Sequence, residues 1–434
     1  MTGSFRASSL ALLLGLALPA PAAAQGTTLR ESVETAKALM LNGRSVEARM
    51  LLQRLTNENP RSNDAAFLLG LLAIEARDYN VAVDQFRSIL VRNPDAIRVR
   101  LELGRAFFLK QDYENAYRQF QFARAGRLPA GVGTSIDRFV SAIRQQKDWS
   151  YNLSFALAPD SNINNGTSAR ETELFGLPFE LGDDTRRKSG VGIAIDAGTE
   201  FAPQIGDNVR LRLGAAAQRR EYRDNDFDDM TIALHAGPRV VLPRWDVSVL
   251  ATGFRRQFGG RRLSEGAGAR IEATHHRGAR TAISIGASAQ QVNYPDYPLQ
   301  DGRALSLWGG AVRALTPASS VNARVGLSRK TARTPDLTSW SGWAAAGYYR
   351  DLPGGFSVYV EPSYGASRYD AADPFFGERR KDRLLELQVA VLNRSIVFER
   401  FTPRLALTFA RRNSTIDIYD FNQRRLEVGI TSSF

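Results

Sequence analysis

The chain has 434 residues, with 57 Lys and Arg against 45 Asp and Glu, three His and no Cys. The absence of Cys excludes a disulfide scaffold, a thiolate zinc site and a cysteine nucleophile. A mean hydropathy of −0.27 and the lack of an apolar run of about 20 residues beyond the N-terminus exclude a helical membrane protein. The net charge of +12 describes the surface and not the fold, and we expect no nucleic-acid partner.

Residues 1–24 have the pattern of a secretory signal peptide. Arg6 supplies a positive charge, an apolar run spans 10–18, and the alanines at 22–24 offer a small-residue cleavage site. The apolar run is too short to cross a bilayer as a helix. We therefore expect a protein that leaves the cytoplasm.

The N-terminal third contains a repeat. The segment RDYNVAVDQF at 77–86 returns as QDYENAYRQF at 111–120, and this 34-residue period is that of tetratricopeptide repeats, in which each unit is a pair of helices. We predict two full units at 63–94 and 97–128, with a partial unit at 30–60.

Three positions in each repeat are predicted to pack its helices together. A glycine on the first helix lets the second approach closely, and a small and a large residue four positions apart share one buried face of the second. These residues are Gly70, Ala82, Phe86, Gly104, Ala116 and Phe120. Because one helix pair cannot bury its own apolar face, the units must stack. We expect residues 26–147 to form a helical domain that binds a protein partner. Its linker is expected at 129–147 and includes a short helical run at 135–146.

From Trp149 onward the apolar residues recur at every second position, as at Leu385, Leu387 and Val389. Runs of this kind, joined alternately by short turns and longer loops, are typical of a transmembrane β-barrel. The predicted fold is therefore a helical repeat domain followed by a 14-stranded antiparallel β-barrel over 148–434. The predicted strands are 149–158, 185–201, 208–221, 229–241, 245–257, 262–275, 280–291, 303–314, 320–330, 339–350, 356–367, 383–394, 403–413 and 421–434.

The number of strands and the sequence of the last strand predict where in the cell the protein lies. An even number of strands brings both ends of the barrel to one side of the membrane, where closure leaves no strand edge unpaired. The last strand ends at Phe434 with apolar residues at alternate positions before it, which resembles the signal read by the outer-membrane barrel assembly machinery. We expect a bacterial outer-membrane protein, in contact with outer-membrane lipids, whose helical domain lies in the periplasm.

No catalytic set of residues is evident. The sequence has no Gly-x-Ser-x-Gly elbow and no spaced histidine pair, since His235 is expected in mid-strand and His275 and His276 at a periplasmic turn. We predict no enzymatic activity, no cofactor and no metal. Charges of both signs are predicted to face the barrel interior, either as a network of paired charges or as a selectivity lining. They are Arg210, Arg212, Arg270, Arg324, Arg404, Arg425, Asp196, Glu200, Glu272, Glu361, Glu386 and Glu427.

A short motif follows the first strand. By itself the segment predicts only a turn, because its residues favour local hydrogen bonds to the backbone. It consists of Pro159, Asp160, Ser161, Asn162, Ile163 and Asn164. Together with the repeats and the terminal Phe, the motif resembles the surface lipoprotein assembly modifier family.

The resemblance implies an outer-membrane translocon that helps particular lipoproteins, or related soluble proteins, to reach the cell surface. In this view the helical repeats engage the client protein or a periplasmic chaperone, and no catalytic residue carries over. The alternative is a porin for polysaccharide export, a class that also joins tetratricopeptide repeats to a barrel.

Overall fold

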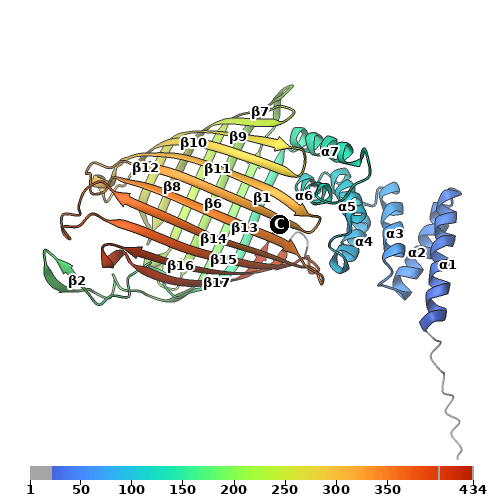
Figure 1. The fold of residues 1–434 in the computed structure, drawn as a ribbon, viewed down its shortest axis with the longest axis horizontal. Helices are drawn as coiled ribbons and strands as arrows, with labels where there is room; N and C mark the ends of the chain where they lie inside the picture. The colour runs from blue at the N-terminus through green and yellow to red at the C-terminus, as the bar shows by residue number, and fades with distance from the viewer. Residues whose placement is uncertain (1–21, 399–400, 433–434) are drawn as a thin grey trace, which may run out of the picture.

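The structure is a computed structural model that describes residues 22–398 and 401–432. A row of helices leads into one end of a closed barrel (Figure 1). The predicted signal peptide lies outside the described residues except for 22–24, which begin the first helix. Within the described part of the chain, no helix is both long and apolar enough to cross a membrane.

The helices form three successive pairs and a seventh helix. They are α1 (Ala22–Leu41), α2 (Ser45–Glu58), α3 (Asn63–Glu75), α4 (Tyr79–Arg92), α5 (Ile97–Leu109), α6 (Tyr113–Arg124) and α7 (Val132–Gln146). The prediction of two repeat units at 63–94 and 97–128 is confirmed. The unit at 30–60 is a complete helix pair and not a partial one, because Val33 and Ala36 of α1 pack against Ala48 and Leu52 of α2.

The turn within each of the two later pairs has the same construction. Arg77 and Gln111 take up left-handed backbone conformations, with φ of 62° and 64°. The residues that follow, Asp78 and Asp112, each cap the next helix by accepting a hydrogen bond from the backbone N–H three residues on. An aspartate at this position satisfies a donor that the helix itself leaves unpaired. The repeated Asp-Tyr pairs of the sequence therefore mark the starts of α4 and α6.

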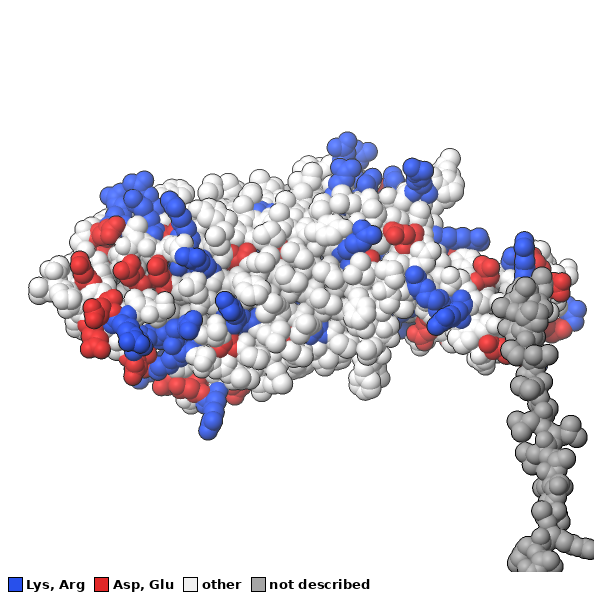
Figure 2. All heavy atoms as spheres, turned by 60° about the horizontal axis from the view of Figure 1, so that its bottom comes forward, with Lys and Arg blue, Asp and Glu red and all other residues white. Residues whose placement is uncertain are grey.

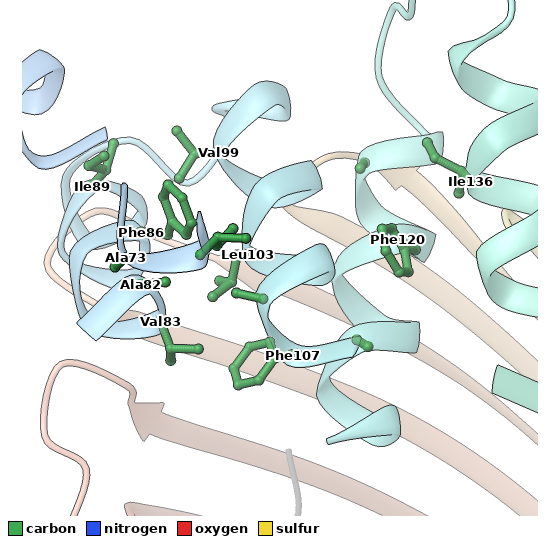
Figure 3. Close-up of a cluster of buried hydrophobic side chains, with 14 of the residues drawn as sticks. Ala73, Ala82, Val83, Phe86, Ile89, Val99, Leu103, Phe107, Phe120 and Ile136 are labelled. Carbon is green, nitrogen blue, oxygen red and sulfur yellow. The ribbon is translucent and has the colours of Figure 1, made fainter. Parts of the chain in front are cut away.

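Phenylalanine and glycine fit together inside each pair. Figure 3 shows the rings of Phe86 and Phe120 among the buried side chains of the helices. The side chains of Phe86 and Phe120 are buried, as are Ala82 and Ala116. A Cβ atom placed on Gly70 would lie 2.6 Å from Cε1 of Phe86, and one on Gly104 would lie 2.9 Å from Cε1 of Phe120. Each ring thus occupies the space that any other residue would need at the glycine.

The helical run predicted at 135–146 is present as α7, but the prediction that 129–147 is a linker is wrong. Residues Ile136, Val140 and Ile143 of α7 are buried in the same core as the repeats. The ring of Phe139 stacks on Phe120 at 5.0 Å between centroids. The apolar positions of α7 recur at helical spacing, so it continues the stack and covers its last apolar face.

The barrel has 14 antiparallel strands, as predicted. They are β1 (Trp149–Asp160), β4 (Gly190–Phe201), β6 (Val209–Tyr222), β7 (Asp229–Val241), β8 (Trp245–Phe258), β9 (Arg261–Arg277), β10 (Thr281–Asn293), β11 (Gly302–Thr316), β12 (Ser319–Lys330), β13 (Ser339–Asp351), β14 (Phe356–Tyr369), β15 (Lys381–Asn393), β16 (Thr402–Ser414) and β17 (Phe421–Thr431). Pairing of β1 with both β4 and β17 closes the sheet.

The entry to β4 and the turn between β4 and β6 differ from the prediction. Strand β4 begins at Gly190 and not at 185, and the first long loop contains a hairpin of β2 (Glu171–Leu174) and β3 (Leu177–Glu180). A short strand, β5 (Gln204–Gly206), extends the hairpin between β4 and β6. The predicted last strand reached Phe434, which lies outside the described residues.

The connections differ between the two ends of the barrel. At the end that carries the helices they are mostly short, as at 242–244, 278–280 and 317–318, whereas the opposite end has longer loops such as 161–189 and 370–380. The turn at 259–260 is the exception, because Gly259 and Gly260, both with positive φ, make a two-residue hairpin turn at the loop end.

The outer wall of the barrel is apolar. Exposed side chains that point outward include Leu213, Leu234, Leu307, Leu327 and Leu385. Charged atoms gather at the two ends of the molecule, and the middle of the barrel shows few of them (Figure 2). An apolar belt between charged ends is the surface that a barrel presents to a bilayer.

Candidate functional site: the helix-covered mouth of the barrel

The helical domain lies over one mouth of the barrel (Figure 1). Helices α4 to α7 contact successive turns: the backbone N–H of Gly354 donates to the carbonyl of Val91 at 2.7 Å, and that of Ala279 donates to Asp137 at 2.8 Å. The ring of Phe122 on α6 stacks on Tyr349 of β13 at 5.8 Å. The helices are therefore anchored to the rim of this mouth at several separate points.

A buried arginine of α7 forms the first ionic junction. Arg144 donates to Asp246 of β8 at 2.6 Å and to the carbonyl of Leu242 at 2.8 Å. The carboxylate of Asp246 also accepts a hydrogen bond from Arg239 at 2.9 Å, and it lies 2.9 Å from Nε2 of His276. Two side chains from the neighbouring strands and one from the helix thus meet at a single carboxylate.

A second junction has the same design on α5. Arg100 is buried and donates to Asp351 of β13 at 2.8 Å and to Gln119 at 3.0 Å. Asp351 also accepts a hydrogen bond from Ser357 at 2.7 Å. A cavity of about 70 Å³ lies beside this junction, between the helices and the turns of the barrel. Burial of both partners makes the pairing obligatory, because either charge alone would be costly to bury.

One further arginine lies on a turn beside the second junction. Arg394 donates from Nε to Ser357 at 2.8 Å. Burial lowers the pKa of Arg394 to about 10, and the positive charge of Arg118 acts in the same direction. The side chain still carries its positive charge at neutral pH.

The predicted position of two histidines was wrong. His275 and His276 lie within β9 and not at a turn, because this strand continues to Arg277. The third, His235, places Nε2 3.1 Å from a carboxylate oxygen of Glu200. Among the described residues no group of His, Asp and Glu is arranged as a metal site.

Most of the charges predicted to face the interior are paired there. Arg212 contacts Glu200 at 2.6 Å, and it also contacts Glu272. The remaining pairs are Arg324–Glu361 at 2.6 Å, Arg404–Glu427 at 2.9 Å, Arg270–Glu272 at 3.4 Å and Arg425–Glu427 at 3.4 Å. Arg210 pairs with Asp148, whereas Asp196 and Glu386 make no ion pair within the described residues. This geometry favours a paired network over a lining of one sign.

A half-buried apolar strip lies on the side of α5 away from the barrel. Leu101 and Phe108 share this side with Arg98 and Arg105, since these residues are three, four or seven positions apart. The guanidinium of Arg98 stacks over Phe67 of α3 at 4.7 Å. We call Phe67, Arg98, Leu101, Arg105 and Phe108 the helical strip. The repeat pattern in the sequence predicts a partner-binding surface on the helices. It does not predict which side of the helices faces away from the barrel.

The motif at the end of β1 fastens the closing seam of the barrel. Asn162 is fully buried, and its side-chain amide donates to the carbonyls of Gly166 at 2.9 Å and Asn422 at 3.1 Å. The side chain of Gln423 in β17 donates to Asp160 at 2.8 Å. Because β1 and β17 are the first and last strands of the barrel, these contacts join its two ends.

The other motif residues hold the entry to β4. Asn164 donates to the carbonyl of Arg186 at 2.7 Å, and the N–H of Ile163 donates to the carbonyl of Lys188 at 2.8 Å. The hydroxyl of Ser161 accepts the N–H of Arg424 at 2.8 Å. The first two bonds hold residues 186 and 188 just before β4, and the third adds to the seam with β17.

Pro159 has a different part in the seam. It has no N–H to donate, and the register with β17 passes from Leu157 to Asp160 without pairing the two residues between them. The motif contacts therefore hold the seam at the point where its ladder of backbone bonds is interrupted. The motif lies at the end of β1 away from the helices, so the structure does not bring it together with the repeat residues.

A sequence model of the family described as surface lipoprotein assembly modifier matches residues 149–434, which is the barrel. The chain belongs to the surface lipoprotein assembly modifier family. A tetratricopeptide repeat model matches residues 67–127, in agreement with α3 to α6.

The chain is similar to curated relatives over most of its length. The chain is 22% identical to Surface lipoprotein assembly modifier 1 of Neisseria meningitidis serogroup B, over 85% of this chain and 75% of that protein. It is also 22% identical to a protein of the same name from Haemophilus influenzae, over 91% and 82%. The Hemophilin secretion modulator of Acinetobacter baumannii is 22% identical over 85% and 78%. Family and barrel together point to the bacterial outer membrane.

Proposed function

We propose that the chain is an outer-membrane translocon for particular client proteins, either surface lipoproteins or related secreted proteins. The observation that carries the proposal is the position of the helical repeats over the mouth of a barrel that belongs to this family. A plain diffusion pore has no need of such a cover. The protein acts by binding and guiding a chain, with no catalytic step.

The two parts have separate tasks in this proposal. Residues 26–147 form a periplasmic domain that engages the client or its chaperone, and residues 148–434 form the barrel that passes the client outward. The even strand number puts both ends of the barrel on one side, where the helices also lie. Short turns on that side are the usual periplasmic arrangement.

The helical strip is the proposed contact for the client. Leu101 and Phe108 pack against the helical core, and their exposed parts give an apolar track. The exposed Arg98 and Arg105 border it, and Arg105 lies 3.6 Å from Glu102. Arg100 lies two residues from Arg98 and points to the other side of α5, where it pairs with Asp351 of the barrel. A client segment with apolar side chains and carboxylates therefore fits this surface.

Quantitative proteomics of surface-shaved cells tests the proposal. Deletion of the gene should remove one or a few proteins from the shaved fraction while their total amount stays the same, and a plasmid copy should restore them. Loss of an exported polysaccharide with no protein affected would favour the porin alternative.

A charge reversal tests the helical strip in the same assay. The double variant Arg98→Glu and Arg105→Glu should reduce client exposure about tenfold, since it replaces attraction by repulsion at the contact. Arg54→Glu, an exposed arginine of α2, is the matched control and should have no effect. Equal display by both variants would rule out the strip as the contact.

A further inference from the structure

The outer wall of the barrel has a groove near its loop end, on strands β14 to β17. Its volume is about 900 Å³. Leu385, Leu387 and Phe409 form an apolar floor, and Arg187, Arg411 and Arg424 lie along its edge. We call this feature the arginine-edged groove.

The strand register makes the groove continuous. Leu385 lies opposite Arg411, and Leu387 lies opposite Phe409, which in turn lies opposite Arg424. These side chains alternate with residues that face the interior, such as Glu386. The apolar floor therefore faces the bilayer, and the arginines lie where the apolar belt ends.

The charges of these arginines are not neutralised by the protein. All three are exposed, and none makes an ion pair within the described residues. Arg411 donates only to the neutral amide oxygen of Asn413, at 3.0 Å. On other strands at the same end, by contrast, Arg219 and Arg255 are paired with Glu221 and Glu265 at 3.1 Å and 3.3 Å.

We infer that the arginine-edged groove binds a phosphorylated glycolipid of the outer leaflet. Guanidinium groups match phosphate oxygens with two parallel hydrogen bonds each. An acyl chain would lie along Leu385, Leu387 and Phe409 while Arg187, Arg411 and Arg424 hold the phosphate. The loop end faces the outer leaflet in the orientation proposed above, so the inference rests on that orientation but not on the export of a client.

Titration of the purified full-length protein in detergent with bis-phosphorylated lipid A, followed by native mass spectrometry, tests the site. The triple variant Arg187→Gln, Arg411→Gln and Arg424→Gln should bind about tenfold more weakly than the unaltered protein, because it loses the charge-assisted bonds. The matched control replaces three arginines that have glutamate partners, Arg219, Arg255 and Arg262, by Gln. It should bind within about twofold of the unaltered protein, because exposed ion pairs contribute little.

Two further probes separate the headgroup from the acyl chains. Dephosphorylated lipid A should bind about tenfold more weakly, and inorganic phosphate should not displace the lipid, because it gains nothing from the apolar floor. Equal binding by the triple variant, equal binding of the dephosphorylated lipid, or displacement by inorganic phosphate would each overturn the inference. Heat-modifiable gel mobility shows that each variant is folded, and loss of client export alone would leave the inference intact.

Discussion

Single residues explain both the packing of the repeats and the closure of the barrel. The ring of Phe86 fills the space next to Gly70, and the buried amide of Asn162 joins the first and last strands. The first arrangement could be argued from the sequence, because the spacing of glycine and phenylalanine follows the repeat. The second could not, because Asn162 and Asn422 are far apart in the chain and the motif alone indicates only a turn.

Replacement of Phe86 by Ala should destabilise the helical domain by about 3–5 kcal/mol, because the side chain is fully buried and the cavity cannot collapse. Hydrogen exchange of the full-length protein should show faster exchange in α3 and α4. The exposed Leu41→Ala is the control and should leave the exchange rates as they are. Unchanged protection in the Phe86 variant would contradict this account of the core.

Replacement of Asn162 by Ala should weaken the barrel seam by about 1–3 kcal/mol, because it leaves the carbonyls of Gly166 and Asn422 without their donor. The temperature at which the protein changes its gel mobility should fall. Ser168→Ala, an exposed change in the same loop, should have no effect. A seam that melts at the same temperature in both variants would show that the motif does not hold it.

At the scale of helices and strands, period and turn chemistry predicted most of the elements. The strands were found because apolar residues alternate on a wall that faces lipid, and α3 to α6 because the repeat is strict. The prediction of a linker at 129–147 is wrong because a local pattern does not reveal the partner of α7, which is the open face of α6. The prediction that His275 and His276 lie at a turn is wrong because β9 extends to Arg277. There the side chain of His276 contacts Asp246 of the neighbouring strand.

The two ionic junctions between helices and strands are the contacts that the sequence predicts least well. Each joins residues about a hundred or more positions apart. Replacement of Arg144 by Ala should cost about 3–5 kcal/mol of helix docking, because it leaves the carboxylate of Asp246 buried with one partner fewer. Hydrogen exchange should rise in α7. Lys37→Ala, which breaks only the exposed pair with Glu34, is the control. Undisturbed exchange in the Arg144 variant would mean that the helices dock by other contacts.

For the whole molecule, the arrangement of the parts is that of a barrel with a helical domain docked at one mouth. The helices are fixed by two buried arginines over one mouth, the interior carries paired charges, and the outer wall is apolar. The fold does not by itself name a client, because the helical strip and the interior are general surfaces for a polypeptide. The family adds the expectation of a protein cargo.

Surface exposure of the client in cells that make only the barrel, 148–434, tests the cooperation of the two domains most directly. We predict that protease shaving will release at least about tenfold less client from these cells than from cells with the full chain, because nothing delivers the client to the mouth. The barrel itself should still reach the outer membrane and keep its heat-modifiable mobility. Full client display by the barrel alone would contradict the account.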